Sequence, residues 1–292
     1  MLLHYRKLGS GRPLFILHGL FGLSDNWNAI GKMLSSSTPA LPFREGAKTP
    51  SSKENYAVYL IDLRNHGSSP HSDEWTYPAM AEDIHELQKN ILNTEQTNIR
   101  TNEHSNSEHS PIILMGHSLG GKVAMQFAAM YPELIEKLIV ADMAPKDYPG
   151  NQFPFIEKLL KIDLAAMKTR KEAEAELNKI IKDNATIQLL LKNIQWIENG
   201  SSSLLAWKFN LKVLAKNQNT IGNTFSLGEK TINTPTLFIR GERSNYILDS
   251  DIPQIKNHFP NSEIKTIAGA GHWVHADKPG EFGDAVWQFL NA

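Results

Sequence analysis

Short apolar runs bounded by turn residues recur along the chain. They cover residues 13–17, 56–61, 111–115, 138–141 and 235–239, and residues 263–267 are strand-like as well. These runs lack strict apolar and polar alternation, which is typical of strands buried on both faces of a sheet. Helix-like segments such as residues 123–130 lie between them, and Val286, Phe289 and Leu290 share one face of a closing helix. The alternation predicts an α/β fold with a mostly parallel sheet.

The alternation of strand-like and helix-like segments is interrupted between about residues 146 and 230, where apolar positions recur at helical spacing. The two stripes are Ala173, Leu177, Ile180 and Ile181, and Leu204, Trp207, Leu211 and Leu214. They are consistent either with simply packed helices or with a helical cap whose apolar side chains line a pocket. We expect a core of residues 1–145 and 231–292, with residues 146–230 inserted in it as the cap.

Two polar insertions, residues 42–53 and 93–110, also interrupt the pattern. The second has almost no apolar residue and is expected to be a mobile surface loop. His104 and His109 lie in the second insertion, but no closed ligand set accompanies them, so we expect no metal site.

Composition narrows the class of protein further. The 292 residues carry a net charge of −1, which argues against a nucleic-acid partner. No apolar run approaches the roughly 18 residues that cross a bilayer, and residues 1–7 do not resemble a signal peptide. The absence of Cys excludes disulfides and thiol catalysis. We expect a cytoplasmic protein, monomeric or a small homo-oligomer, without a membrane span.

The candidate chemistry is centred on Gly116-His-Ser118-Leu-Gly120, a G-x-S-x-G pattern between a predicted strand and a predicted helix. This is the arrangement of a nucleophile elbow, whose tight turn needs residues without side chains two positions before and after the serine. The helix N-terminus there favours a developing negative charge. A competing P-loop interpretation of Gly116 to Lys122 fails because Val123 lacks the hydroxyl that holds Mg²⁺.

A serine nucleophile needs a downstream base. His272 is the favoured candidate, since it lies in a Gly-rich loop after the strand-like run 263–267. His275 competes for the role, although a supporting or surface position suits it better. His117 and His66 are more consistent with structural roles.

The base needs a carboxylate that orients it. The position after the post-cap strand holds Ser244, with Glu242, Asp249 and Asp251 nearby as possible substitutes. Asp142 is favoured, because an acid at the end of a buried strand is costly without a partner.

An oxyanion requires two convergent N–H donors. Leu119, which follows the nucleophile, supplies one candidate, and Leu20 or Phe21 in the loop after residues 15–19 supplies the other.

Five motifs, in this order, resemble the α/β-hydrolase superfamily. They are HGLFG at 18–22, DLRNHGSS at 62–69, GHSLGGK at 116–122, ADMAP at 141–145 and GAGHWVHAD at 269–277. The likeness is strongest to small carboxylesterases of the YbfF-like group and their mitochondrial abhydrolase relatives. It implies an eight-strand-type sheet with a helical cap, and it supports Asp142 as the acid. It also implies that Asp62, Arg64 and His66 form a structural turn near the site.

The sequence thus predicts a serine carboxylesterase for small to medium acyl esters, with no cofactor. The predicted site residues are Ser118, His272 and Asp142 for catalysis, Leu20 and Leu119 for the oxyanion, and Phe21, His117, Trp207 and Trp273 for substrate binding. Phe153, Phe155, Trp196 and Trp207 either line an acyl pocket or form the core of the cap. A thioesterase with the same triad and a non-catalytic binding protein on the same fold remain alternatives.

Overall fold

The apolar runs form the centre of a mixed β-sheet in the computed structural model, which describes residues 1–36, 55–98, 110–148, 153–200, 202–218 and 225–292. Within these residues the sheet has seven strands in the order β1-β3-β2-β4-β5-β8-β9. The strands are β1 (Tyr5–Leu8), β2 (Arg12–Leu17), β3 (Tyr56–Ile61), β4 (Ile112–His117), β5 (Ile135–Ala141), β8 (Thr236–Gly241) and β9 (Ser262–Ile267). Only β1 is antiparallel to its neighbour.

The α/β fold class predicted from the sequence is confirmed, and all six predicted runs are strands. The described residues form seven strands where an eight-strand-type sheet was expected. Strand β1 was not predicted, because it lies at the sheet edge, alternates exposed and half-buried positions and carries Arg6 and Lys7.

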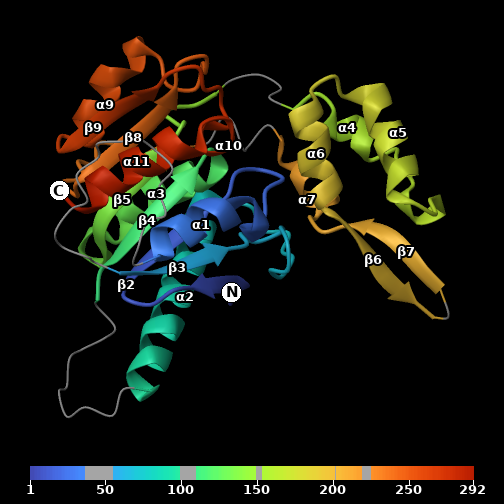
Figure 1. Ribbon diagram of the computed structural model, residues 1–292, viewed down its shortest axis with the longest axis horizontal. Helices are drawn as coiled ribbons and strands as arrows, with labels where there is room; N and C mark the ends of the chain where they lie inside the picture. Colours follow the sequence, from blue (N-terminus) through green and yellow to red (C-terminus); the bar gives the residue numbers. More distant parts are fainter. Residues whose placement is uncertain (37–54, 99–109, 149–152, 201, 219–224) are drawn as a thin grey trace.

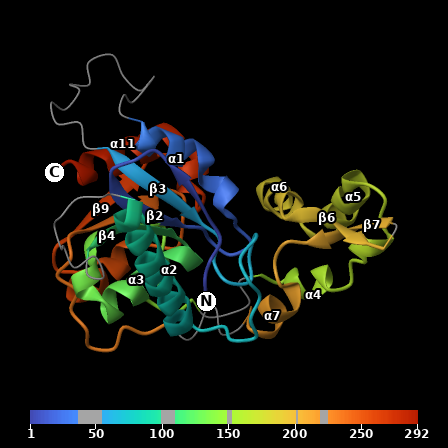
Figure 2. The same cartoon turned by 90° about the horizontal axis from the view of Figure 1, so that it is seen from below.

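Helices cover both faces of the sheet (Figures 1 and 2). Their bounds are α1 (Asn28–Ser35), α2 (Tyr77–Asn98), α3 (Leu119–Met130), α9 (Ile252–His258), α10 (Val274–Asp277) and α11 (Pro279–Leu290), with 3-10 turns η1 (Ser24–Trp27), η3 (Pro132–Leu134) and η5 (Asp249–Asp251).

Successive residues of one strand supply the two halves of the core. Phe15 and Leu17 pack in the cluster that includes α2 and α3, whereas Leu14 and Ile16 pack in the cluster that includes α1 and α11. All four are completely buried. This explains the continuous apolar runs, because side chains alternate between faces and both faces are covered.

A smaller lobe follows β5 and precedes β8, and it stands beside the sheet in Figure 1. Its elements are α4 (Ile156–Leu159), η4 (Leu164–Ala166), α5 (Arg170–Ile180), α6 (Asn184–Lys192), β6 (Ile194–Asn199), β7 (Ser202–Trp207) and α7 (Leu211–Lys216). We call this lobe the cap.

The expectation of a wholly helical cap is wrong, because β6 and β7 form an antiparallel hairpin. Leu204 and Trp207, assigned above to a helical stripe, lie in β7 opposite Ile197 and Ile194, and only Leu211 and Leu214 are helical. Asn-Gly at 199–200 ends β6, and this pair favours hairpin turns over helix.

Trp196 is 48% exposed on β6, so it does not belong to the core of the cap.

The polar insertion 42–53 lies outside the described residues, as do residues 99–109 of the second insertion, including His104 and His109. Residues 93–98 continue α2 and are not the loop that was expected. No Gly or Pro interrupts this stretch, and Asn, Thr, Glu and Gln can extend an existing helix.

No described helix combines the length and the hydropathy that a membrane crossing would require.

Candidate active site

Ser118 lies on a strained turn between β4 and α3, with φ of 52° and ψ of −117°. The flanking glycines make this turn possible. A Cβ on Gly116 would lie 2.1 Å from the Gly120 carbonyl oxygen, and one on Gly120 would lie 2.6 Å from the carbonyl oxygens of Leu17 and His18. The Ser118 amide donates to the Ala141 carbonyl over 3.1 Å, which fixes the turn against β5. This is the geometry that the G-x-S-x-G pattern predicts.

Asp142 and His272 come together at the ends of β5 and β9. The His272 Nδ1 donates to Asp142 Oδ2 over 2.7 Å. The Asp142 carboxylate is fully buried and also accepts bonds from the Gly241 amide, at 3.1 Å, and from the Ser244 hydroxyl. These three donors compensate for the burial of the carboxylate and orient it toward the imidazole.

The other carboxylates considered above have different partners. Glu242 accepts the Gly269 amide at 2.8 Å, and Asp249, whose side chain is 85% exposed, pairs with Arg240 at 2.7 Å. Among the described residues, Asp142 alone of these three acids bonds to His272.

Two further side chains hold His272, and sequence reasoning did not identify either contact. Tyr246 stacks on the imidazole with ring centroids 3.7 Å apart. His117 Nε2 donates to the His272 backbone carbonyl over 2.8 Å. The sequence signals were only the proximity of Tyr246 to Ser244 and of His117 to Ser118.

His117 was predicted to bind substrate, but it is only 1% exposed and lies behind the His272 loop. Burial also holds its pKa well below the usual value, so its ring is neutral. His275, the competing base, is buried and stacks on Trp27 at 4.0 Å, and burial lowers its pKa to about 3. Trp273 is partly exposed, with its ring 5.2 Å from that of His117.

The loop after β2 lies against the elbow, since a Cβ on Gly19 would be 3.2 Å from the Ser118 Cβ. The Phe21 amide of this loop donates to His66 Nε2 over 3.2 Å. No described group accepts the Leu20 amide, nor that of Leu119 at the start of α3. Leu20, rather than Phe21, therefore has an N–H available near the elbow.

Two neutral histidines fix that loop. His18 Nε2 accepts the Leu63 amide at 3.0 Å, and His66 Nδ1 donates to the Arg64 carbonyl at 3.0 Å. Burial lowers the pKa of both rings, to about 3 for His66. Neutral rings are required here, because each Nε2 must accept a hydrogen bond from a backbone amide.

The structural turn implied by the DLRNHG motif supports the same loop. Asp62 accepts the Ser24 amide at 2.6 Å and the Ser68 amide at 2.9 Å, and Arg64 pairs with Asp83 at 2.6 Å while buried. None of these side chains contacts the Asp142–His272 pair.

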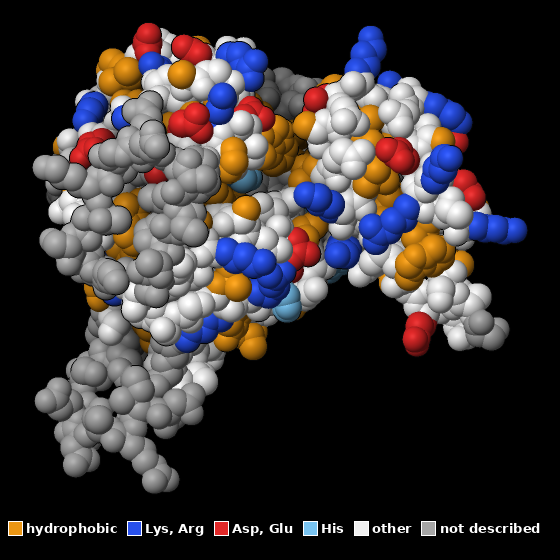
Figure 3. All heavy atoms as spheres, viewed as in Figure 1, with side chains coloured by type: hydrophobic (Ala, Val, Ile, Leu, Met, Phe, Trp, Pro, Cys, Tyr) orange, Lys and Arg blue, Asp and Glu red, His pale blue; other side chains and the backbone are white. Residues whose placement is uncertain are grey.

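Aromatic rings join the loop to the cap. Phe21 contacts Phe153, Phe155 and Phe209 with centroids 5.6, 5.8 and 5.2 Å away, and Trp207 stacks on Phe209 at 5.0 Å. Hydrophobic side chains surround the hollow between the cap and the sheet, where a histidine is also visible (Figure 3).

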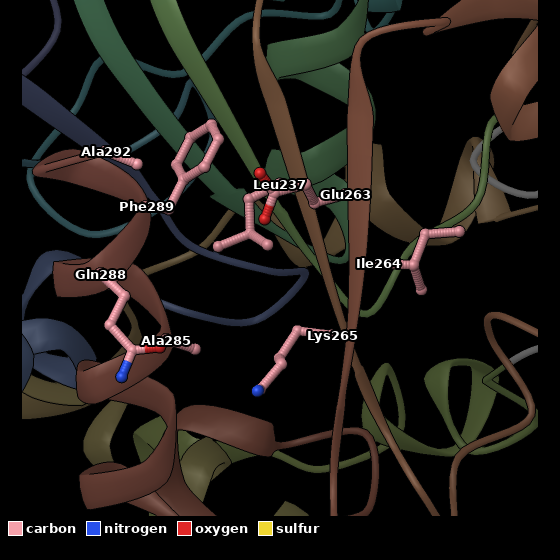
Figure 4. Close-up of a pocket in the computed structure, with 8 residues that line it drawn as sticks. All are labelled: Leu237, Glu263, Ile264, Lys265, Ala285, Gln288, Phe289 and Ala292. Atoms are coloured by element: carbon pink, nitrogen blue, oxygen red, sulfur yellow. The ribbon is translucent and has the colours of Figure 1, made fainter.

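A separate cavity of about 220 Å³ contains none of the predicted site residues (Figure 4). Leu237 and Glu263, near the starts of β8 and β9, contribute to its lining. The rest of the lining comes from the middle of β9 and from the C-terminal part of the chain, including α11, so this cavity lies apart from the Asp142–His272 pair. Among the described residues, no three His, Asp or Glu side chains gather as a metal site would need.

The fold and the elbow are those of the alpha/beta hydrolase family, whose model matches residues 14–285, and the chain belongs to this family.

Similar proteins include esterase YbfF of Escherichia coli, 30% identical over 96% of this chain and 93% of that protein. The mouse sn-1-specific diacylglycerol lipase ABHD11 is 34% identical over 95% of this chain and 80% of that protein. A solved structure, titled marine microorganism esterase, is 39% identical, has a TM-score of 0.81 and covers 99% of both chains. The protein is a hydrolase of this family, and the ester-hydrolase class predicted from its sequence agrees with these named activities.

Proposed function

We propose that this protein is a serine carboxylesterase in which Ser118 is the nucleophile, His272 the general base and Asp142 the residue that orients it. The observation that carries the proposal is the 2.7 Å bond between His272 Nδ1 and a buried Asp142 carboxylate, at the same sheet edge as the strained Ser118 turn. A buried acid paired with an imidazole beside a serine at a helix N-terminus is suited to acyl transfer.

In the first half-reaction, Ser118 Oγ attacks the ester carbonyl carbon while His272 Nε2 takes the hydroxyl proton. The carbonyl oxygen becomes an oxyanion, which accepts hydrogen bonds from the Leu20 and Leu119 amides. Asp142 stabilises the imidazolium that forms. The tetrahedral intermediate then expels the alcohol, which receives the proton from His272, and leaves an acyl-enzyme on Ser118.

In the second half-reaction, water attacks the acyl carbon as His272 takes one of its protons. A second tetrahedral intermediate forms, and its oxyanion accepts hydrogen bonds from the same Leu20 and Leu119 amides. When this intermediate collapses, the bond between the acyl carbon and Ser118 Oγ breaks. The carboxylic acid is released, and the proton on His272 returns to Ser118. Each cycle consumes one ester and one water and produces one acid and one alcohol, with no cofactor.

We further propose that residues 146–230 act as a cap that sizes the acyl pocket, with residues 1–145 and 231–292 forming the core. Phe21, Phe153, Phe155 and Phe209 form a continuous aromatic cluster next to the oxyanion loop, which supports an apolar acyl group. Trp207 extends this cluster by stacking on Phe209. Small to medium acyl chains suit such a pocket.

The test compares p-nitrophenyl esters from acetate to dodecanoate with wild type and Ser118→Ala. We expect kcat/KM to fall by about 10⁴-fold or more in the variant, because a serine nucleophile has no substitute. A fluorophosphonate probe should phosphonylate Ser118 Oγ, with loss of fluoride, in the wild type only. An acyl-thioester series and diacylglycerol, the substrate in the mouse relative's name, belong in the same panel.

Retained turnover in Ser118→Ala would contradict the nucleophile assignment. Hydrolysis of thioesters with no ester turnover would favour a thioesterase that uses the same triad. No turnover of any substrate, with no labelling by the probe, would favour a non-catalytic binding protein.

A further inference from the structure

Asn193 lies at the junction of α6 and β6 in the cap and is completely buried. Its backbone amide donates to the Leu190 carbonyl at 2.9 Å, and its carbonyl accepts the Lys208 amide at 2.7 Å. Asn193 therefore connects α6 to the start of β6 and to the residue that follows β7.

The side-chain amide of Asn193 makes one hydrogen bond within the cap and one to a residue outside it. Its Nδ2 donates to the Leu189 carbonyl at 2.9 Å and to the Phe21 carbonyl at 2.6 Å. The second bond spans 172 positions in the chain and ends in the loop that presents Leu20 to the elbow. Both Nδ2 hydrogens are thus used, one within the cap and one on the oxyanion loop.

The amide oxygen of Asn193 is buried without a hydrogen-bond partner among the described atoms. An unpaired buried acceptor costs about 1–3 kcal/mol, which offsets part of what the two Nδ2 bonds contribute. Such an atom calls for an explanation beyond packing.

Phe21 has a conformation that needs support from both sides. Its φ of 59° is in the left-handed region, which costs a residue with a Cβ roughly 1–2 kcal/mol. On the core side, the Phe21 amide donates to His66 at 3.2 Å. On the cap side, Asn193 donates to the Phe21 carbonyl. Phe21 follows Leu20 directly, so these two bonds hold the backbone next to the Leu20 amide.

We propose that Asn193 is a positioning residue through which the cap completes the oxyanion hole. By bonding the Phe21 carbonyl, it keeps Phe21 in its strained conformation and the Leu20 amide directed at the developing oxyanion. The inference rests on the proposed esterase mechanism. It predicts that the cap contributes to the rate of the chemical step as well as to substrate selection.

The chain offers a matched control in Asn217. This residue ends α7 as Asn193 ends α6, with φ of −106° against −90°. Its Nδ2 donates to the Val213 carbonyl four residues earlier, at 2.9 Å, just as Asn193 Nδ2 bonds Leu189. No described bond joins the Asn217 side chain to the oxyanion loop. Replacing each Asn by Ala removes the same local bond, and only Asn193→Ala removes the bond to Phe21.

The experiment measures kcat, KM and Tm for wild type, Asn193→Ala and Asn217→Ala on one p-nitrophenyl ester. It also measures inhibition by an alkyl trifluoromethyl ketone, which adds Ser118 Oγ to its carbonyl carbon and presents an oxyanion. For Asn193→Ala we expect kcat to fall about 10- to 100-fold with KM within about threefold, since a donor misplaced by about 1 Å costs up to about 10² in rate. Inhibition by the ketone should weaken by a similar factor. Asn217→Ala should leave kcat, KM and the inhibition constant of the ketone near the wild-type values.

Equal kcat and equal ketone affinity in the two variants would overturn the inference, whatever their Tm values. A rise in KM with unchanged kcat would also overturn it, because Asn193 would then act on substrate binding. If Asn193→Ala does not fold, Asn193→Ser is measured instead, since its shorter hydroxyl cannot serve both carbonyls. Wild type without Ser118-dependent turnover would refute the proposed function itself, and the inference with it.

Discussion

The sheet and the cap stabilise their structures in different ways. The sheet is covered by two large buried clusters, one on each face, and all its strands except β1 pair in parallel ladders. The cap's own separate cluster has only four buried residues: Leu164, Ala173, Ile194 and Leu205. Other buried cap side chains, among them Leu177 and Leu190, belong to the cluster shared with the sheet. The cap therefore depends on the sheet for much of its packing.

The two regions also differ in backbone strain. The four non-glycine residues with positive φ among the described residues are Phe21, Asn65, Ser118 and Asp142, and all belong to the sheet region. Three of them are in the candidate site. Strained residues persist only where the surrounding structure holds them in place, and a packed sheet can do this. The comparison indicates that the sheet region holds the proposed catalytic residues in place, whereas the cap contributes additional contacts to the candidate site.

The largest expected effect is a loss of activity in the sheet region, when the proposed triad acid Asp142 is replaced. Asp142→Asn should lower kcat about 10⁴-fold, because His272 would lose the carboxylate that selects its tautomer and stabilises its charge. Steady-state hydrolysis of p-nitrophenyl acetate measures this. Glu242→Gln is the control and should retain wild-type kcat, since Glu242 bonds the Gly269 amide instead. The reverse outcome would move the acid to the end of β8.

A smaller effect compares one glycine in each region. Gly120→Ala should cost about 3 kcal/mol in the free energy of unfolding, because its Cβ would lie 2.6 Å from two backbone carbonyl oxygens that cannot shift easily. Gly200→Ala, in the cap, should cost only about 1 kcal/mol, from its φ of 61°, since no described atom beyond its chain neighbours lies within 4 Å of an added Cβ. Urea denaturation measures both. Equal costs would mean that the cap backbone is as constrained as the elbow.

The smallest effect concerns acid sensitivity between pH 7 and pH 5, the range in which histidines titrate. It should belong to the sheet region, because residues 146–230 contain no histidine. The pKa of His275 is about 3 in the folded protein, against a usual value near 6.5. The unfolded chain therefore binds the proton first as pH falls, so stability is complete above about pH 6.5 and is lost toward pH 3. At pH 5, His275 alone should cost about 2 kcal/mol relative to pH 7.

His275→Phe checks this, since Phe can keep the stack on Trp27 but cannot titrate. Between pH 7 and pH 5 its free energy of unfolding should fall by about 2 kcal/mol less than that of the wild type. Identical losses in the two proteins would show that His275 does not carry the acid sensitivity.

The sequence predicted the parts of the molecule whose signals are local. Ser118 was identified because a tight turn requires Gly116 and Gly120, and both glycines do sit where a Cβ would collide. Five buried strands were found because apolar runs between turn residues have few alternative interpretations. Asp142 was favoured because a buried acid needs a partner, and His272 is the partner in the structure.

The tertiary structure decided everything that depends on contacts between distant residues. The hairpin β6–β7 was read as helix, because Leu204 and Trp207 fit a helical spacing as well as a strand that pairs with residues 194–199. The availability of the Leu20 amide over that of Phe21 depends on His66, 45 positions away, and the support of Phe21 depends on Asn193, 172 positions away. A hydrogen bond forms wherever folding brings donor and acceptor within about 3 Å, and residue spacing along the chain holds no information on such a pair.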